Sequence, residues 1–203
     1  MDNEIIDQVK NFTTNLKTLT DELRVQMALG KAEARDILEQ ERKNFSKYIN
    51  RQKIEINKNV EMSNNIREQF LKTVENLENK LLNTVPTASN DYDQYKKEVL
   101  KNVYQLEEEV KKNYSIMTPD MLKNIDSFKN KMDAFRVNLA LHDKDDPKKV
   151  DRIRNEFSEK LKQVGNLLGE RENAQSKLDS FTKDISVSYK ILRKAISDLS
   201  NKK

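Results

Sequence analysis

The chain has 203 residues, with 38 basic and 34 acidic side chains, and its charged and apolar residues each make up 35%. It has no cysteine, which excludes disulfides and thiolate metal sites, and no apolar run near the ~20 residues of a membrane-spanning helix. With only three glycines and three prolines, this mixed charge is typical of long exposed helices rather than of a disordered chain. Because the acidic start is also unlike a secretory signal, we expect a soluble, cytoplasmic protein.

A first helix is predicted over residues 3–29. Its apolar residues recur at alternating steps of three and four, which places them on one stripe: Ile5, Val9, Phe12, Leu16, Leu19, Leu23 and Met27. Gly30 follows directly, either as a left-handed residue that ends the helix or as a weak point inside a longer one. We expect a turn or a sharp kink there, because a related segment later in the chain is broken at the matching position.

A second, continuous helix is predicted over residues 31–83, roughly 75 Å long at ~1.5 Å per residue. Its apolar series is Ile37, Phe45, Ile49, Ile56, Val60, Phe70, Val74, Leu77 and Leu81. The loop at residues 85–90, which contains Pro86 and small polar residues, ends it.

Three further helices follow from cap signals. Asn90 or Asp91 caps a third helix that reaches about residue 116, and a proline after Thr118 opens a fourth. Residues 142–146 interrupt the fourth helix. Asp146 and the proline after it then start a fifth helix, predicted to run unbroken to about residue 201.

An internal repeat links these helices. The run LRVQMAL at residues 23–29 returns as FRVNLAL at 135–141, shifted by 112 positions. Residues 17–46 and 129–158 share nine identities at this shift, where unrelated helices of this composition would share roughly two or three. The pattern indicates an old duplication of a helical hairpin.

The predicted fold is all-α, an elongated antiparallel helical bundle or coiled coil of about five helices with an internal duplication. We expect a single domain over residues 1–203, with duplicated hairpins at about 3–60 and 119–175 linked by a helix at about 91–117. Three legs of roughly 75 Å would form the rod, and the first helix would lie along the second.

Little in the sequence indicates catalysis or metal binding. His142 is the only histidine, and beside an acid at a predicted turn it is more typical of a helix end than of a general base. The acidic residues 143–146 resemble the start of a calcium loop, but Pro147 and Lys148 stand where a ligand and a glycine are required. We therefore expect no enzyme activity, no cofactor, no metal and no small-molecule substrate.

Four arginines repeat with the duplication. Arg24 matches Arg136 in the first helices of the hairpins, and Arg42 matches Arg154 in the second. They could pair with neighbouring acids while their stems cover apolar surface, which we favour, or they could hold an anionic group at the turn.

The excess of basic residues lies late in the chain. Near its end, Lys183, Lys190, Arg193 and Lys194 form part of a basic amphipathic segment. Such a segment can contact an anionic membrane surface, although cations at a helix C-terminus also suit the helix dipole. Nucleic-acid binding is not indicated, because no basic patch is interleaved with aromatic residues in a known motif.

The segment LRVQMALGKAEARD, residues 23–36, resembles a segment of small uncharacterised bacterial helical or coiled-coil proteins, where it often also occurs in tandem. The second copy departs from it after Leu141. The resemblance implies helical hairpins and a bacterial cytoplasmic setting, and it supplies no functional residues.

Taken together, these features predict a non-catalytic scaffold or interaction protein that binds protein partners, or itself, through apolar helical seams. The alternative is a protein that binds lipid or a membrane surface through amphipathic helices and the basic C-terminal segment.

Overall fold

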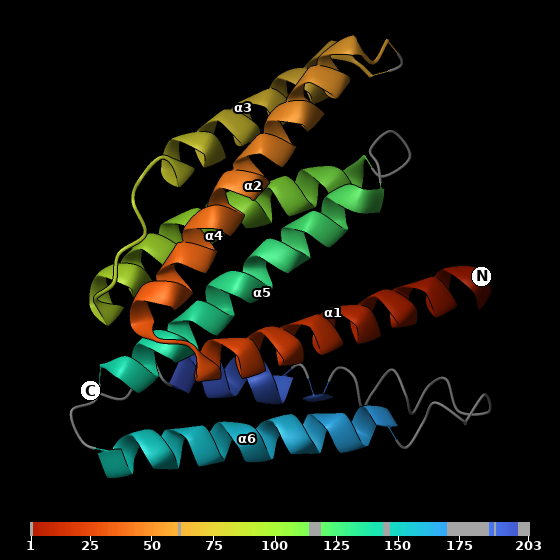
Figure 1. The fold of residues 1–203 in the computed structure, drawn as a ribbon. Coiled ribbons are helices and arrows are strands. Elements are labelled where there is room, and N and C mark those ends of the chain that lie inside the picture. Colours follow the sequence, from red (N-terminus) through yellow and green to blue (C-terminus); the bar gives the residue numbers. More distant parts are fainter. Residues whose placement is uncertain are drawn as a thin grey trace. The chain divides into compact units, whose positions relative to one another are not determined.

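The computed structural model describes residues 2–60, 62–113, 119–143, 147–169, 187–188 and 190–198 (Figure 1). Within these ranges the structure is all-helical and contains no strand. We call residues 187–188 and 190–198 the C-terminal helix. The other helices are α1 (Asp2–Ala28), α2 (Lys31–Lys58), α3 (Asn64–Leu81), α4 (Ser89–Lys112), α5 (Pro119–His142) and α6 (Pro147–Gly169).

The contacts divide the chain into two compact units. Unit 1 comprises Met1–Gly30 and Asp133–Lys203, and unit 2 comprises Lys31–Met132, so α5 begins in unit 2 and ends in unit 1. The single elongated domain and its two duplicated hairpins stay predictions. The two compact units do not coincide with the expected hairpins. The boundary after Gly30 falls inside the hairpin expected at 3–60, and the boundary after Met132 falls inside the one expected at 119–175.

Unit 2 is built from α2, α3, α4 and the first part of α5, and consecutive helices run up and down (Figure 1). The rings of Phe45 on α2 and Phe128 on α5 stack with centroids 4.3 Å apart. Each helix contributes one apolar stripe to the core, as the spacing of three and four residues requires. The largest fully buried side chains of this unit include Ile49, Phe70, Leu77, Leu81, Tyr92, Leu106, Met121 and Ile125.

The predicted continuous helix over residues 31–83 is wrong. It is two helices, α2 and α3, and α3 folds back along α2 so that Lys53 pairs with Glu78 at 3.3 Å. The non-helical segment between α2 and α3 ends at Ser63. The hydroxyl oxygen of Ser63 accepts a hydrogen bond from the backbone N–H of Ile66 and so caps α3. Val60, predicted to face inward, is 93% exposed at the turn.

The starts of the later helices agree in part with the predictions. α5 begins at Pro119, the predicted first position, and α6 begins at Pro147. However, α4 begins at Ser89 rather than after an Asn90 or Asp91 cap, and its N-cap residue Ala88 makes no side-chain capping bond. The structure therefore begins this helix without the carboxylate or amide cap expected from the sequence.

Unit 1 packs α1, the end of α5, α6 and the C-terminal helix around one apolar core. Its buried residues are Leu16, Leu19, Leu23, Ala134, Val137, Leu141, Ile153, Phe157, Leu192 and Ile196. The fifth helix predicted to run unbroken from 147 to 201 is wrong. In a straight helix Phe157 and Leu192 would lie about 50 Å apart at ~1.5 Å per residue, yet both belong to this core.

The helix is interrupted at Gly30, as expected, because α1 ends at Ala28 and α2 begins at Lys31. Gly30 is not a left-handed residue, since no described glycine has a positive φ. The carbonyl groups at the end of α1 are therefore not satisfied by the usual glycine motif. Side chains of α5 bind them instead, as described below.

Candidate functional site

The four repeated arginines do not form two equivalent sites. The side chain of Arg24 is 61% exposed and lies 3.5 Å from Asp21, whereas its counterpart Arg136 is only 4% exposed. Arg154 is half exposed and lies 3.8 Å from Asp151. Equivalent positions of the repeat therefore lie in different surroundings, and the two exposed arginines pair with acids of their own helices.

Arg42 ties three elements of unit 2 together. Its guanidinium donates to Glu39, with the nearest nitrogen 2.6 Å from Oε2, and also donates to the carbonyl of Leu81 at the end of α3. Glu39 in turn accepts a 2.8 Å hydrogen bond from the backbone N–H of Val85. Burial raises the pKa of Glu39, but the bonds from Val85 and Arg42 outweigh it and lower the pKa overall. This arrangement favours a structural role for Arg42.

The end of α1 is capped from α5 by two side chains. Asn138 is fully buried, and its Nδ2 donates to the carbonyls of Gln26 at 2.8 Å and Leu29 at 2.9 Å. Nε2 of His142 lies 2.9 Å from the same Leu29 oxygen, so its N–H donates to that carbonyl in the matching tautomer. His142 thus occupies a helix end, the position expected for it.

Sequence reasoning did not single out Asn138. Its signal is a short amide between Val137 and Leu139, inside a segment that is otherwise almost entirely apolar. A buried amide of this kind needs partners, and the last carbonyls of a neighbouring helix offer acceptors.

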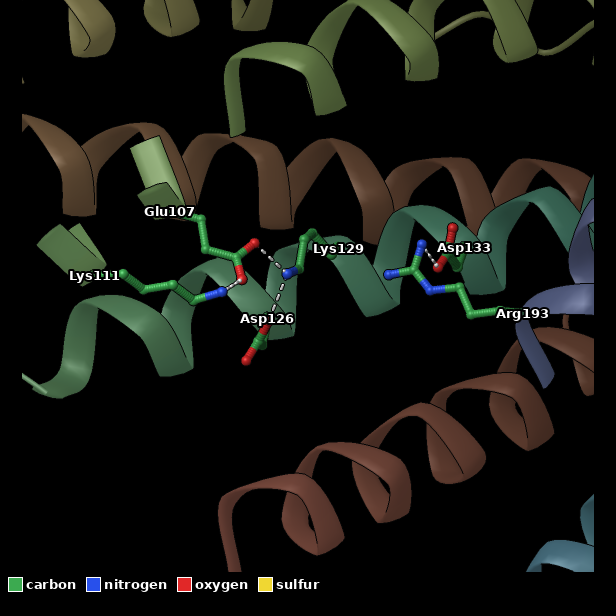
Figure 2. A network of polar contacts seen from close by, with 6 residues as sticks. All are labelled: Glu107, Lys111, Asp126, Lys129, Asp133 and Arg193. Carbon is green, nitrogen blue, oxygen red and sulfur yellow. Dashed lines mark hydrogen bonds and ion pairs between the residues drawn. The ribbon is translucent and has the colours of Figure 1, made fainter. Parts of the chain in front are cut away.

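Lys129 is the centre of a second network that the sequence did not reveal, shown in Figure 2. Its Nζ lies 2.7 Å from Glu107 of α4 and 2.7 Å from Asp126, while the side chain is only 7% exposed. The ammonium also lies 5.5 Å from the centre of the Tyr104 ring, and Lys111 holds the other oxygen of Glu107. The network joins α4 to α5 within unit 2.

The charges in this network stabilise each other. Burial lowers the pKa of Lys129, but Asp126 and Glu107 outweigh that effect and raise it above its ordinary value. Burial raises the pKa of Glu107, yet the hydrogen bonds from Lys111 and Lys129 lower it overall. Lys129 and Glu107 therefore stay charged near neutral pH, which suits a structural role better than that of a general acid or base.

The predicted basic C-terminal face is only partly available to a ligand. Arg193 lies 3.6 Å from the buried carboxylate of Asp133 on α5 (Figure 2). Lys190 and Lys194 are exposed, and Lys183 lies outside the described residues. Of the three predicted cations that the structure describes, Arg193 therefore pairs with Asp133, whereas Lys190 and Lys194 are exposed.

An open groove lies between α6 and the C-terminal helix in unit 1. Its volume is about 1030 Å³. Its apolar residues are Phe157, Ile191 and Ala195, and its rim is charged: Lys148, Asp151, Arg152, Glu156, Glu159, Lys194 and Asp198, together with Asn155. The charged residues of α6 that line the groove include Lys148, Arg152, Glu156 and Glu159, whose steps of three and four place them on one side of the helix.

Two kinds of feature are absent from the described residues. They contain no group of three or more His, Cys, Asp or Glu side chains that could hold a metal ion. None of the helices in the described ranges is long and apolar enough to cross a bilayer. Most of the calcium-like segment, residues 144–146, lies outside those ranges.

The chain was compared with known proteins of three kinds. No protein-family model, no curated protein and no solved structure matches it. The expectations for its function therefore depend on the geometry of the described residues.

Proposed function

We propose that this chain is a non-catalytic helical scaffold that binds protein partners or a second copy of itself through helical seams. The observation that carries the proposal is the groove between α6 and the C-terminal helix. These two helices share a core through Ile153 and Leu192, yet they leave Ile191 and Ala195 only partly covered beside an exposed charged rim. A third or fourth helix could bury such a seam.

The polar networks support the same proposal. The polar side chains of Arg42, Lys129 and Asn138 bind helix ends or join neighbouring helices. Groups used in this way stabilise a scaffold, and their charges are already compensated by protein partners.

The alternative, contact with an anionic membrane surface, has less support. Two exposed lysines on the C-terminal helix favour it, but Arg193 pairs with Asp133. Co-sedimentation with vesicles of anionic lipid at low salt tests it. Binding that disappears in a Lys190→Glu and Lys194→Glu variant would favour the membrane over the protein partner.

Cross-linking followed by mass spectrometry tests the scaffold proposal, applied both to the purified chain and to the chain in its native cell. We expect intermolecular cross-links to lysines bordering the groove, Lys148 and Lys194 among them. A chain that is monomeric in isolation and acquires no intermolecular cross-link in the cell would contradict the proposal.

A further inference from the structure

The charges on the exposed face of α6 are separated along the helix. Lys148 and Arg152 lie in its first half with Asp151 between them, so this half is basic on balance, and Glu156 and Glu159 follow in the second. All five side chains are exposed and line the groove. One side of the helix thus changes from basic to acidic within about three turns.

This pattern is complementary to itself when it is reversed. In an antiparallel pair of α6 helices, the register that places Lys148 beside Glu159 of the partner subunit also places Arg152 beside Glu156 of the partner subunit, to within one residue. A two-fold axis repeats both contacts, as an interface between identical subunits requires. Parallel pairing would instead place like charges side by side.

We propose that the groove is a self-association surface and that its occupant is a second copy of this chain, with the two α6 helices antiparallel. The inference rests on the proposed function and names the partner. Each subunit would contribute α6 and its C-terminal helix to a four-helix arrangement, and Ile191 and Ala195, which are only partly covered, would form the apolar part of the contact.

The ion pair between Arg152 and Glu156 of α6 does not oppose this assembly. Arg152 and Glu156 lie 3.9 Å apart, with side chains 65% and 54% exposed, so their mutual attraction is largely screened by water. Exchanging that contact for one between subunits leaves neither charge without a partner. Intersubunit pairs partly shielded by the apolar residues would be less screened.

Two charge-reversal variants of the full chain test the proposal. Lys148→Glu with Arg152→Glu makes this face of α6 acidic, whereas Glu156→Lys with Glu159→Lys makes it basic. Lys97→Glu with Lys101→Glu is the matched control, because these exposed lysines have the same spacing on α4 of unit 2. Sedimentation equilibrium measures the association of each protein, and circular dichroism checks that each remains helical.

We expect the unaltered chain and the control to dimerise, and each groove variant to dissociate with a Kd at least about tenfold higher. Mixing the acidic and basic variants should restore a dimer, now heteromeric, which a loss of folding could not do. That dimer should weaken as salt is raised.

Failure of the self-association inference can be told apart from failure of the scaffold proposal. An unaltered chain that stays monomeric but is cross-linked to another protein through the groove overturns the self-association inference and leaves the scaffold proposal standing. A dimer that neither groove variant weakens places self-association elsewhere and also overturns the inference. A chain that binds neither itself nor any protein overturns both.

Discussion

Asn138 shows how a single polar side chain can set the end of a helix. The last carbonyls of α1 have no intrahelical donor, and Gly30 does not supply the usual left-handed cap. Asn138 reaches them from α5, where it is completely buried. The end of α1 therefore depends on a residue more than a hundred positions away in sequence.

Asn138→Leu should lower the free energy of unfolding by about 2 kcal/mol, since it leaves the carbonyls of Gln26 and Leu29 without the amide donor. Urea denaturation followed by circular dichroism measures the change. Asn124→Leu is the control, because Asn124 donates to the backbone carbonyl of Asp120 in its own helix, and the loss of that bond should cost less. Equal losses in the two variants would contradict the capping role.

Lys129 leads to a prediction about its neighbour. Lys129→Met should raise the pKa of Glu107 towards its ordinary value, because one of the two ammonium groups that bind the carboxylate is removed. A carbon-detected NMR titration of the glutamate carboxyl groups measures this shift. Lys80→Met is the matched control, since it removes an ion-pair partner of Glu98 rather than of Glu107. A pKa of Glu107 unchanged by Lys129→Met would contradict the network.

At the scale of a helix, the start of α3 rests on one serine. Ser63→Ala should destabilise the chain by about 1 kcal/mol, because the N–H of Ile66 loses its side-chain acceptor. Ser63→Asp keeps an acceptor and adds a charge that suits the helix N-terminus, so it should retain most of the stability. Thermal unfolding measures both, and equal losses from Ala and Asp would argue against capping.

The helices were predictable where apolar spacing and a proline agree, as at the starts of α5 and α6. The break before Ser63 was missed because the apolar series can be followed through Val60 at a helical spacing. Its local signals were Asn59 and Ser63, which favour turns and caps over helix interiors. Periodicity shows which face of a segment is apolar, but it does not show whether the segment folds back on itself.

The candidate site was less predictable than the helices. Four arginines were singled out by the repeat, yet their environments differ because identical residues can meet different neighbours. Arg193 and Lys194 are adjacent in sequence but have different surroundings: Arg193 pairs with Asp133, whereas Lys194 lines the groove. The groove itself requires the C-terminal helix to lie against α6, a long-range contact that no local pattern encodes.

At the scale of the whole molecule, partly or fully buried ionisable groups make the free energy of unfolding depend on pH in both the acidic and the alkaline range. The pKa of Glu39 and of Glu107 is lowered in the folded chain, so their contribution is present above their ordinary value of 4.5 and is lost as the pH falls through the folded values. On the alkaline side the pKa of Lys129 is raised, so its contribution is present below 10.5 and is lost as the pH rises through the folded value.

Tyr95 provides the sharpest test of this dependence. Burial raises its pKa from 10.0 to about 12, so the unfolded chain loses the phenol proton first and unfolding becomes easier between those values. We expect the free energy of unfolding to fall through this range, by roughly 1.4 kcal/mol per pH unit while only the unfolded form has ionised.

Tyr95→Phe removes the ionisable group, so urea denaturation at pH values from 9 to 12 should show a shallower fall. A Lys129→Met variant, less stable at neutral pH, should also show a shallower fall, because the pKa of Lys129 is raised in the folded chain. If Tyr95→Phe leaves the alkaline slope unchanged, the phenol is not held in the neutral form by its burial in unit 2.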